Sequence, residues 1–158
     1  MAKEIERKYL VTDDSYKSMA THSRHIIQTY LSTSPDATVR LRIIDTRAFL
    51  TVKSRNKGCC RGEWEYEIPV SDAREMIDSC NIANNTIEKT RYYIPFDNHT
   101  WEIDEFAGRL TGLTVAEIEL PTPDAPYTLP PFIGTEVTDD PRYYNSVLTT
   151  LTTLTYPF

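Results

Sequence analysis

Residues 4–11 of the chain read Glu-Ile-Glu-Arg-Lys-Tyr-Leu-Val, and their alternation of polar and apolar side chains predicts a β-strand. Successive side chains of a strand point to opposite faces, so Glu4, Glu6 and Lys8 share one face. Two carboxylates at positions i and i+2 lie roughly 6.5–7 Å apart. They repel each other unless water or a bound cation separates them, so this strand raises the question of what lies beside Glu4 and Glu6.

The composition is that of a soluble domain. The 158 residues are 40% hydrophobic and 25% charged, and the formal net charge of −6 gives no reason to expect nucleic-acid binding. Three cysteines without a CxxC spacing predict reduced thiols. The first residues lack an apolar signal region, and no apolar run is long enough to span a membrane. We therefore expect a single cytoplasmic domain over residues 1–158, without a membrane partner.

Segments with a period of two residues dominate the chain and predict eight strands. These segments are Glu4–Leu10, Ile26–Leu31, Val39–Ile44, Phe49–Arg55, Gly62–Ile68, Ile87–Ile94, Thr100–Phe106 and Thr114–Leu120. Eight strands are enough to close a small barrel. The predicted fold is mainly β (α+β), a closed eight-stranded antiparallel β-barrel with a few flanking helices.

Three other segments carry helix signals, namely a capping residue, an acidic first turn or a proline at the first helical position. They run from Thr12 or Asp13 to about Ala20, from Ser71 to Asn81 and from Asp140 towards Leu151. Residues 121–131 contain five prolines, which predict an extended crossover rather than a regular element.

The charged faces of the predicted strands carry blocks of one sign. The blocks read E-x-E at 4–6, R-x-R at 40–42, E-x-E-x-E at 63–67, K-x-R at 89–91, E-x-D at 102–104 and E-x-E at 117–119. An ordinary sheet with one face in water is one interpretation. However, like charges repeated along one face are destabilising unless they are opposed across the sheet or by a ligand.

A closed barrel with its charged faces inward gives these blocks a purpose. Arginine and lysine suit phosphate oxygens, while Mg²⁺ and Mn²⁺ prefer carboxylate, water and phosphate oxygens together. Such a lumen would bind a polyanion with divalent metal ions, and a metal ion near Glu4 and Glu6 would explain their proximity.

With these residues laid out, the chain resembles the CYTH superfamily, the triphosphate tunnel metalloenzymes. The hallmark of that family is an E-x-E-x-K strand, here Glu4, Glu6 and Lys8. The match continues in order through VRLRI, FLTVK, EWEYEI, IEKTRYYI, WEIDEF, AEIEL and GTEVTDDPRYYN, and it covers nearly the whole chain. The resemblance is greatest to small single-domain bacterial members, and the family fold of eight antiparallel strands agrees with the strand count.

The resemblance implies roles for the matching residues and a Mg²⁺ or Mn²⁺ cofactor. It implies metal binding by Glu4, Glu6 and Glu119, with Glu117 as a supporting or second-metal ligand. It implies triphosphate binding by Lys8, Arg40, Arg42, Lys53, Lys89 and Arg91. It implies that Glu65, Glu67 and Asp104 are inward acids that orient those cations or assist a second metal.

The reaction that follows is hydrolysis of a linear triphosphate by a metal-bound or metal-oriented water. No phosphate-binding glycine loop and no Ser/His/Asp or Cys/His arrangement is evident, so we expect no covalent intermediate. The catalytic candidates are Lys53, which would polarise the water, and Glu65 or Glu117, which would accept its proton. Spacing alone does not choose between them. Tyr30, inward by alternation, is either a substrate contact or a packed barrel residue.

Inorganic tripolyphosphate is the first choice of substrate, because it requires nothing beyond the charged lumen. The same family includes class IV adenylate cyclases and thiamine triphosphatases, so the fold does not settle the substrate. We see no residue set for adenine and ribose, and the outward alternation of Trp64 and Trp101 disfavours an aromatic platform for thiamine. A non-catalytic polyphosphate or nucleotide sensor is the alternative from another class. The expected partner is a small-molecule triphosphate, and the apolar outer faces are compatible with a homodimer.

Overall fold

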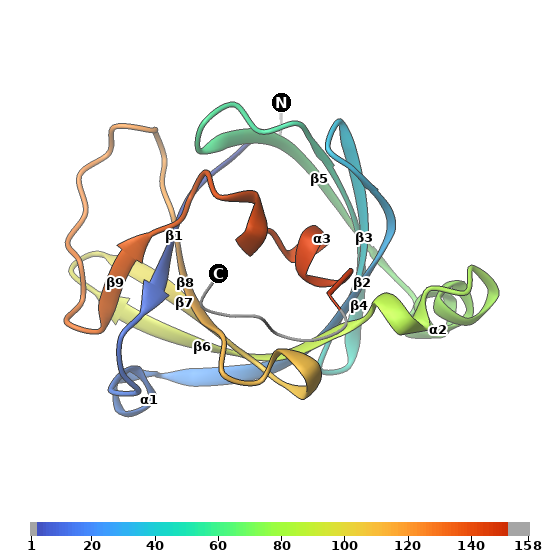
Figure 1. Cartoon of the computed structure of the whole chain (residues 1–158), viewed down its shortest axis with the longest axis horizontal. Helices are drawn as coiled ribbons and strands as arrows, with labels where there is room; N and C mark the ends of the chain where they lie inside the picture. Colours follow the sequence, from blue (N-terminus) through green and yellow to red (C-terminus); the bar gives the residue numbers. More distant parts are fainter. Residues whose placement is uncertain (1–2, 152–158) are drawn as a thin grey trace.

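An eight-stranded antiparallel β-barrel forms the body of the protein in the computed structural model, which describes residues 3–151. Each strand pairs with its neighbours in the order β1-β5-β4-β3-β2-β6-β7-β8, and β8 returns to β1 to close the ring (Figure 1). The predicted barrel is confirmed. Its strands are β1 (Lys3–Val11), β2 (His22–Ser34), β3 (Ala37–Ile44), β4 (Arg47–Ser54), β5 (Cys60–Ile68), β6 (Ile87–Phe96), β7 (His99–Phe106) and β8 (Thr114–Glu119).

Strand β1 closes the barrel because it changes partners along its length. Its central part, from Glu6 to Leu10, pairs with β8. Its first residues, 3–5, pair with β5, and its last residues, 9–11, pair with a ninth strand, β9 (Ile133–Glu136). The alternation did not predict β9, which has only four residues and lies outside the ring of eight.

The larger apolar core lies on the outside of the barrel, over β1, β6, β7 and β8. Trp101 is fully buried there and packs against Tyr9 and Tyr127, with ring centroids 5.7 and 6.1 Å apart. Helix α1 (Tyr16–Met19) and the crossover after β8 cover this face through side chains such as Tyr16 and Phe132. Residues 121–131 form no helix or strand, as their prolines predicted.

A second core fills one end of the barrel interior, and we call it the apolar plug. Some of its members, such as Ile87 and Phe106, have the same inward alternation as the charged residues of their strands. Helix α3 (Asn145–Leu148) lies within the outline of the ring in Figure 1 and places Leu148 in this cluster. The buried residues of the plug are Ile87, Phe106, Leu110, Leu113, Val115, Val137, Tyr143 and Leu148.

The helices are shorter than the sequence predicts, apart from α2 (Val70–Ser79), whose Ala73 packs on Ile43 and Ala48. Helix α1 has four residues. The single helix predicted from Asp140 is instead a 3₁₀ turn, η3 (Pro141–Tyr143), followed by α3. The two are separate because Tyr144 has an extended backbone, with ψ at 132°.

Two further 3₁₀ turns, η1 (Ala83–Asn85) and η2 (Gly108–Leu110), precede β6 and β8. Strand β2 starts at His22, four residues before the predicted Ile26, and extends to Ser34. Within residues 3–151, no helix has the length and apolar composition needed to cross a membrane.

Candidate active site

A cavity of about 270 Å³ lies in the barrel, and nearly all of its charged lining residues come from the predicted charged faces. The connection between β4 and β5 borders it, as does the segment around α3. Six cationic side chains line the cavity: Lys8, Arg40, Arg42, Lys53, Arg61 and Arg91. Seven carboxylates line it as well: Glu4, Glu6, Glu63, Glu65, Glu102, Glu117 and Glu119. At least one member of every block of charge therefore faces this one cavity.

Arg42 differs from the other arginines of the cavity because it has no carboxylate partner within residues 3–151. Its buried Nε, like that of Arg40, also lacks a hydrogen-bond acceptor there. Burial and the neighbouring guanidinium groups of Arg40 and Arg91 lower the pKa of Arg42 to about 10. Its charge is therefore unfavourable as it stands. An anion bound beside Arg42 would relieve it.

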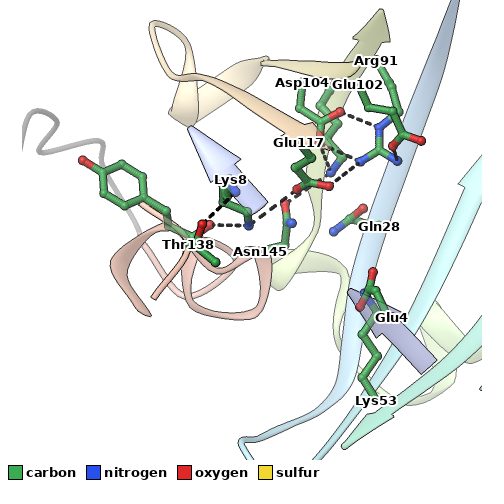
Figure 2. A network of polar contacts seen from close by, with 12 residues as sticks. Glu4, Lys8, Gln28, Lys53, Arg91, Glu102, Asp104, Glu117, Thr138 and Asn145 are labelled. Atoms are coloured by element: carbon green, nitrogen blue, oxygen red, sulfur yellow. Dashed lines mark hydrogen bonds and ion pairs between the residues drawn. The ribbon is translucent and has the colours of Figure 1, made fainter. Parts of the chain in front are cut away.

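Arg40 and Arg91 are held by carboxylates. Arg40 Nη2 lies 3.3 Å from Glu65 Oε2 and donates a hydrogen bond to Thr51 Oγ1 at 3.2 Å. Arg91 donates to both oxygens of Asp104, at 2.7 and 2.8 Å, and pairs with Glu102 at 2.6 Å (Figure 2). These partners fix both guanidinium groups at the cavity wall.

Lys89 lies deeper than predicted and does not line the cavity. It is fully buried, and its Nζ donates to Asp104 Oδ2 at 2.7 Å and to Asn145 Oδ1 at 3.3 Å. Burial lowers the pKa of Lys89 to about 7, and the charge of Arg91 adds to this shift, although Asp104 opposes it. The structure thus places Lys89 behind Asp104, at the boundary with the apolar plug.

Lys8 and Glu117 face each other across the pairing of β1 with β8. Lys8 Nζ lies 3.6 Å from Glu117 Oε1 and donates to the Tyr143 carbonyl oxygen at 3.2 Å. Glu117 Oε2 also lies 3.7 Å from Arg91 Nη2. Although burial opposes the shift, Lys8 and Arg91 lower the pKa of Glu117 and keep it ionised.

Glu4 is held by two cations. Lys53 Nζ donates to both of its oxygens, at 3.0 and 2.9 Å, and Arg61 Nε donates to Oε2 at 3.1 Å. Although burial opposes the shift, these two cations lower the pKa of Glu4 to about 2. Figure 2 shows the contact of Glu4 with Lys53, apart from the network of Arg91.

Glu6 and Glu119 have no such partner. They lie opposite each other in the β1–β8 register, and neither makes an ion pair within residues 3–151. Burial, together with the nearby carboxylates of Glu117 and Glu4, raises the pKa of Glu6 to about 8. Burial and neighbouring carboxylates also raise the pKa of Glu119. This group of oxygen donors lacks a cation.

The donor set fits a hard divalent cation in its chemistry, because it offers only carboxylate oxygens that repel each other. As placed, no three acidic, histidine or cysteine side chains within residues 3–151 converge on one metal position. The contacts of Glu4 with Lys53 and Arg61 account for part of this, because they direct one carboxylate to protein cations.

Two of the predicted inward acids lie differently from each other. Glu65 borders the cavity, with a side chain 38% exposed, and accepts a hydrogen bond from Thr51 Oγ1 at 2.9 Å. Glu67 does not line the cavity. It is half exposed and makes a two-pronged contact with Arg47, at 2.9 and 2.7 Å. The alternation continues past the end of the cavity, so Glu67 shares the parity but not the environment.

Several residues of the cavity were absent from the prediction. Arg61 shares the alternation of Glu63 and Glu65, and the predicted strand missed it only because it began at Gly62. Tyr30, for which two roles were open, also lines the cavity. The polar lining residues Thr138, Tyr144, Asn145 and Ser146 come from the chain after β9, where no periodicity exists to indicate them.

Comparison with known proteins gives a consistent result. The CYTH domain model matches residues 2–145. The chain is 46% identical over 148 residues to an inorganic triphosphatase of Acetivibrio thermocellus, with 94% of each chain covered. It is 37% identical over 150 residues to an inorganic triphosphatase of Nitrosomonas europaea, with 92% of this chain and 95% of that protein covered.

The fold agrees with these relatives. A crystal structure of an inorganic triphosphatase superposes with a TM-score of 0.68 at 34% identity, covering 98% of this chain and 99% of that chain. The E-x-E-x-K strand, the closed barrel and all the charged residues of the cavity lie within residues 2–145. The chain therefore belongs to the CYTH domain family.

Proposed function

We propose that the protein hydrolyses a triphosphate in the barrel cavity, with inorganic tripolyphosphate as the substrate and Mg²⁺ or Mn²⁺ as the cofactor. The names of the relatives support this reaction class, since the two curated relatives are inorganic triphosphatases. The observation that carries the proposal is the pattern of unpaired charges. Within residues 3–151, Arg42 has no anionic partner, while Glu6 and Glu119 have no cationic partner. A triphosphate bound with a divalent cation supplies both.

The phosphate-binding residues would be the cations of the cavity wall. Arg42 would bind non-bridging oxygens, with Arg40 and Arg91 beside it, because a guanidinium fork matches phosphate geometry. Lys8 and Lys53 would contribute point charges. Lys89 would act through Asp104 and Arg91 rather than by direct contact, since it lies behind the wall. Stabilising the charge on these oxygens is the main requirement of phosphoryl transfer.

Glu4, Glu6 and Glu119 would hold the metal, with Glu117 as a supporting ligand. Bound there, a divalent cation would neutralise phosphate oxygens and orient water for attack. Water would attack a terminal phosphorus, the P–O–P bond would break, and phosphate and pyrophosphate would leave. Lys53, Glu65 and Glu117 all border the cavity and are our candidates for the proton transfer. Asp104 would orient Arg91, and we expect no direct role for Glu67.

The test is product release from tripolyphosphate, ATP and thiamine triphosphate with Mg²⁺ or Mn²⁺, with cyclic AMP measured in the ATP reactions. We expect preferential turnover of tripolyphosphate, loss of activity in EDTA and recovery when either metal is returned. Cyclic AMP with pyrophosphate would instead establish a cyclase. Binding of triphosphate without any product would establish a sensor. Purified Glu4→Gln protein controls for a contaminating phosphatase.

A further inference from the structure

Arg61 lies where β1 meets β5, directly opposite Glu4 in the register of the two strands. Its side chain is 23% exposed and lines the cavity. Only its Nε is engaged, in the 3.1 Å contact with Glu4 Oε2. Its two terminal nitrogens make no hydrogen bond within the part of the chain that the structure describes. Arg61 is thus a cavity cation with an unused guanidinium fork.

The two cations on Glu4 are not held equally. Lys53 Nζ contacts both carboxylate oxygens and its side chain is 8% exposed, whereas Arg61 makes one contact from the more open side. A divalent cation that used Glu4 as a ligand would have to compete with these contacts. The contact of Arg61 with Glu4 is therefore easier to break than that of Lys53, because Arg61 makes one hydrogen bond rather than two and is more exposed to water.

We propose that Arg61 is a built-in counter-ion that competes with the divalent cation for Glu4 and, once displaced, binds the triphosphate through its free fork. This inference rests on the proposed function, because it concerns the same metal and substrate. It assigns Arg61 two opposite effects. Arg61 weakens the binding of metal alone, because it occupies an oxygen of Glu4. It strengthens substrate binding, because a guanidinium fork suits a phosphate group.

The experiment compares wild type with Arg61→Ala and with Arg61→Lys, which keeps the charge but loses the fork. Binding of Mn²⁺ alone is followed through the electron paramagnetic resonance signal of the free ion. We expect Arg61→Ala to bind Mn²⁺ about threefold more tightly, as for loss of a partly exposed ion pair. We expect its KM for tripolyphosphate to rise about tenfold, with a smaller change in kcat. Arg61→Lys should lie between wild type and alanine in both measurements.

Arg55→Ala is the matched control, because Arg55 follows β4, is 60% exposed and pairs with Asp36 outside the cavity. It should change neither Mn²⁺ affinity nor KM. Equal or weaker Mn²⁺ binding in Arg61→Ala would overturn the counter-ion role, and an unchanged KM would overturn the substrate role. Tighter Mn²⁺ binding in a protein that hydrolyses no triphosphate would support the counter-ion role while refuting the proposed function. Arg61→Gln provides the same test if the alanine variant does not fold.

Discussion

The two ends of the barrel interior are built from the same strands and the same alternation, yet they differ completely in chemistry. On β6, Ile87 belongs to the apolar plug and Arg91 lines the cavity. On β7, Phe106 belongs to the plug while Glu102 lines the cavity. Alternation therefore determines which side chains point inward. The position along the strand determines whether an inward side chain packs or carries charge.

The two ends also differ in what they contribute to folding. The plug buries apolar surface, which stabilises the fold by roughly 25 cal/mol per Å². In the described part of the chain, the cavity holds an arginine without an anionic partner and carboxylates without a cationic partner, which is unfavourable when no ligand is bound. We therefore expect substitutions in the plug to reduce stability and substitutions in the cavity to reduce activity.

The largest effect is expected from Leu110→Ala in the plug. Leu110 is 1% exposed and does not line the cavity, so its truncation leaves a void in a closed core. The free energy of unfolding should fall by about 2–5 kcal/mol, as measured by urea denaturation. The kcat of the folded variant should stay within about twofold of wild type, because Leu110 does not line the cavity. A large loss of kcat without loss of stability would show that the plug also contributes to activity, and would contradict the separation of the two regions.

Glu4→Gln, in the cavity, should reduce activity without reducing stability. It keeps the shape of the side chain but removes the charge that a metal ligand requires, so turnover should fall by at least about tenfold. Circular dichroism should show an intact fold. Glu88→Gln is the control, since Glu88 is exposed on β6 and contacts His25 rather than the cavity. Activity above about a tenth of wild type would exclude Glu4 as a metal ligand.

Arg42→Ala should separate substrate binding from stability. We expect KM for tripolyphosphate to rise about tenfold, while kcat changes less. The melting temperature should be unchanged or higher, because the variant removes an unpaired charge beside Arg40 and Arg91. Arg24→Ala should leave KM unchanged, because Arg24 is 48% exposed, pairs with Asp45 and does not line the cavity. An unchanged KM in Arg42→Ala would show that Arg42 does not bind the phosphate groups of the substrate.

The smallest effect is expected from Glu67→Gln. The resemblance to tunnel enzymes implies an inward role for Glu67, but the structure places it with Arg47 outside the cavity. Solvent-exposed ion pairs contribute little to stability. Initial rates and melting temperature should therefore match those of wild type. A tenfold loss of activity would show that the cavity extends to this end of β5 when substrate is bound.

Arg61 and Glu67 show the limits of predicting cavity residues from the alternation of side chains along a strand. Both have the parity of Glu63 and Glu65 on β5. Arg61 was missed because the predicted strand began one residue too late, and Glu67 was included because parity contains no information about where a cavity ends. The chain after β9 shows a different limit, because Tyr144 and Asn145 border the cavity from a segment without periodicity.

The sequence by itself determined the barrel, the inward direction of the charged faces and most of the residues that line the cavity. It could do so because a period of two residues is a local property of an extended chain and needs no partner. Only the tertiary structure decided which cation meets which carboxylate, that Lys89 lies behind Asp104, and that one end of the interior is apolar. These features depend on the register between strands distant in sequence and on how the ring closes at β1, and neither is encoded in any single strand.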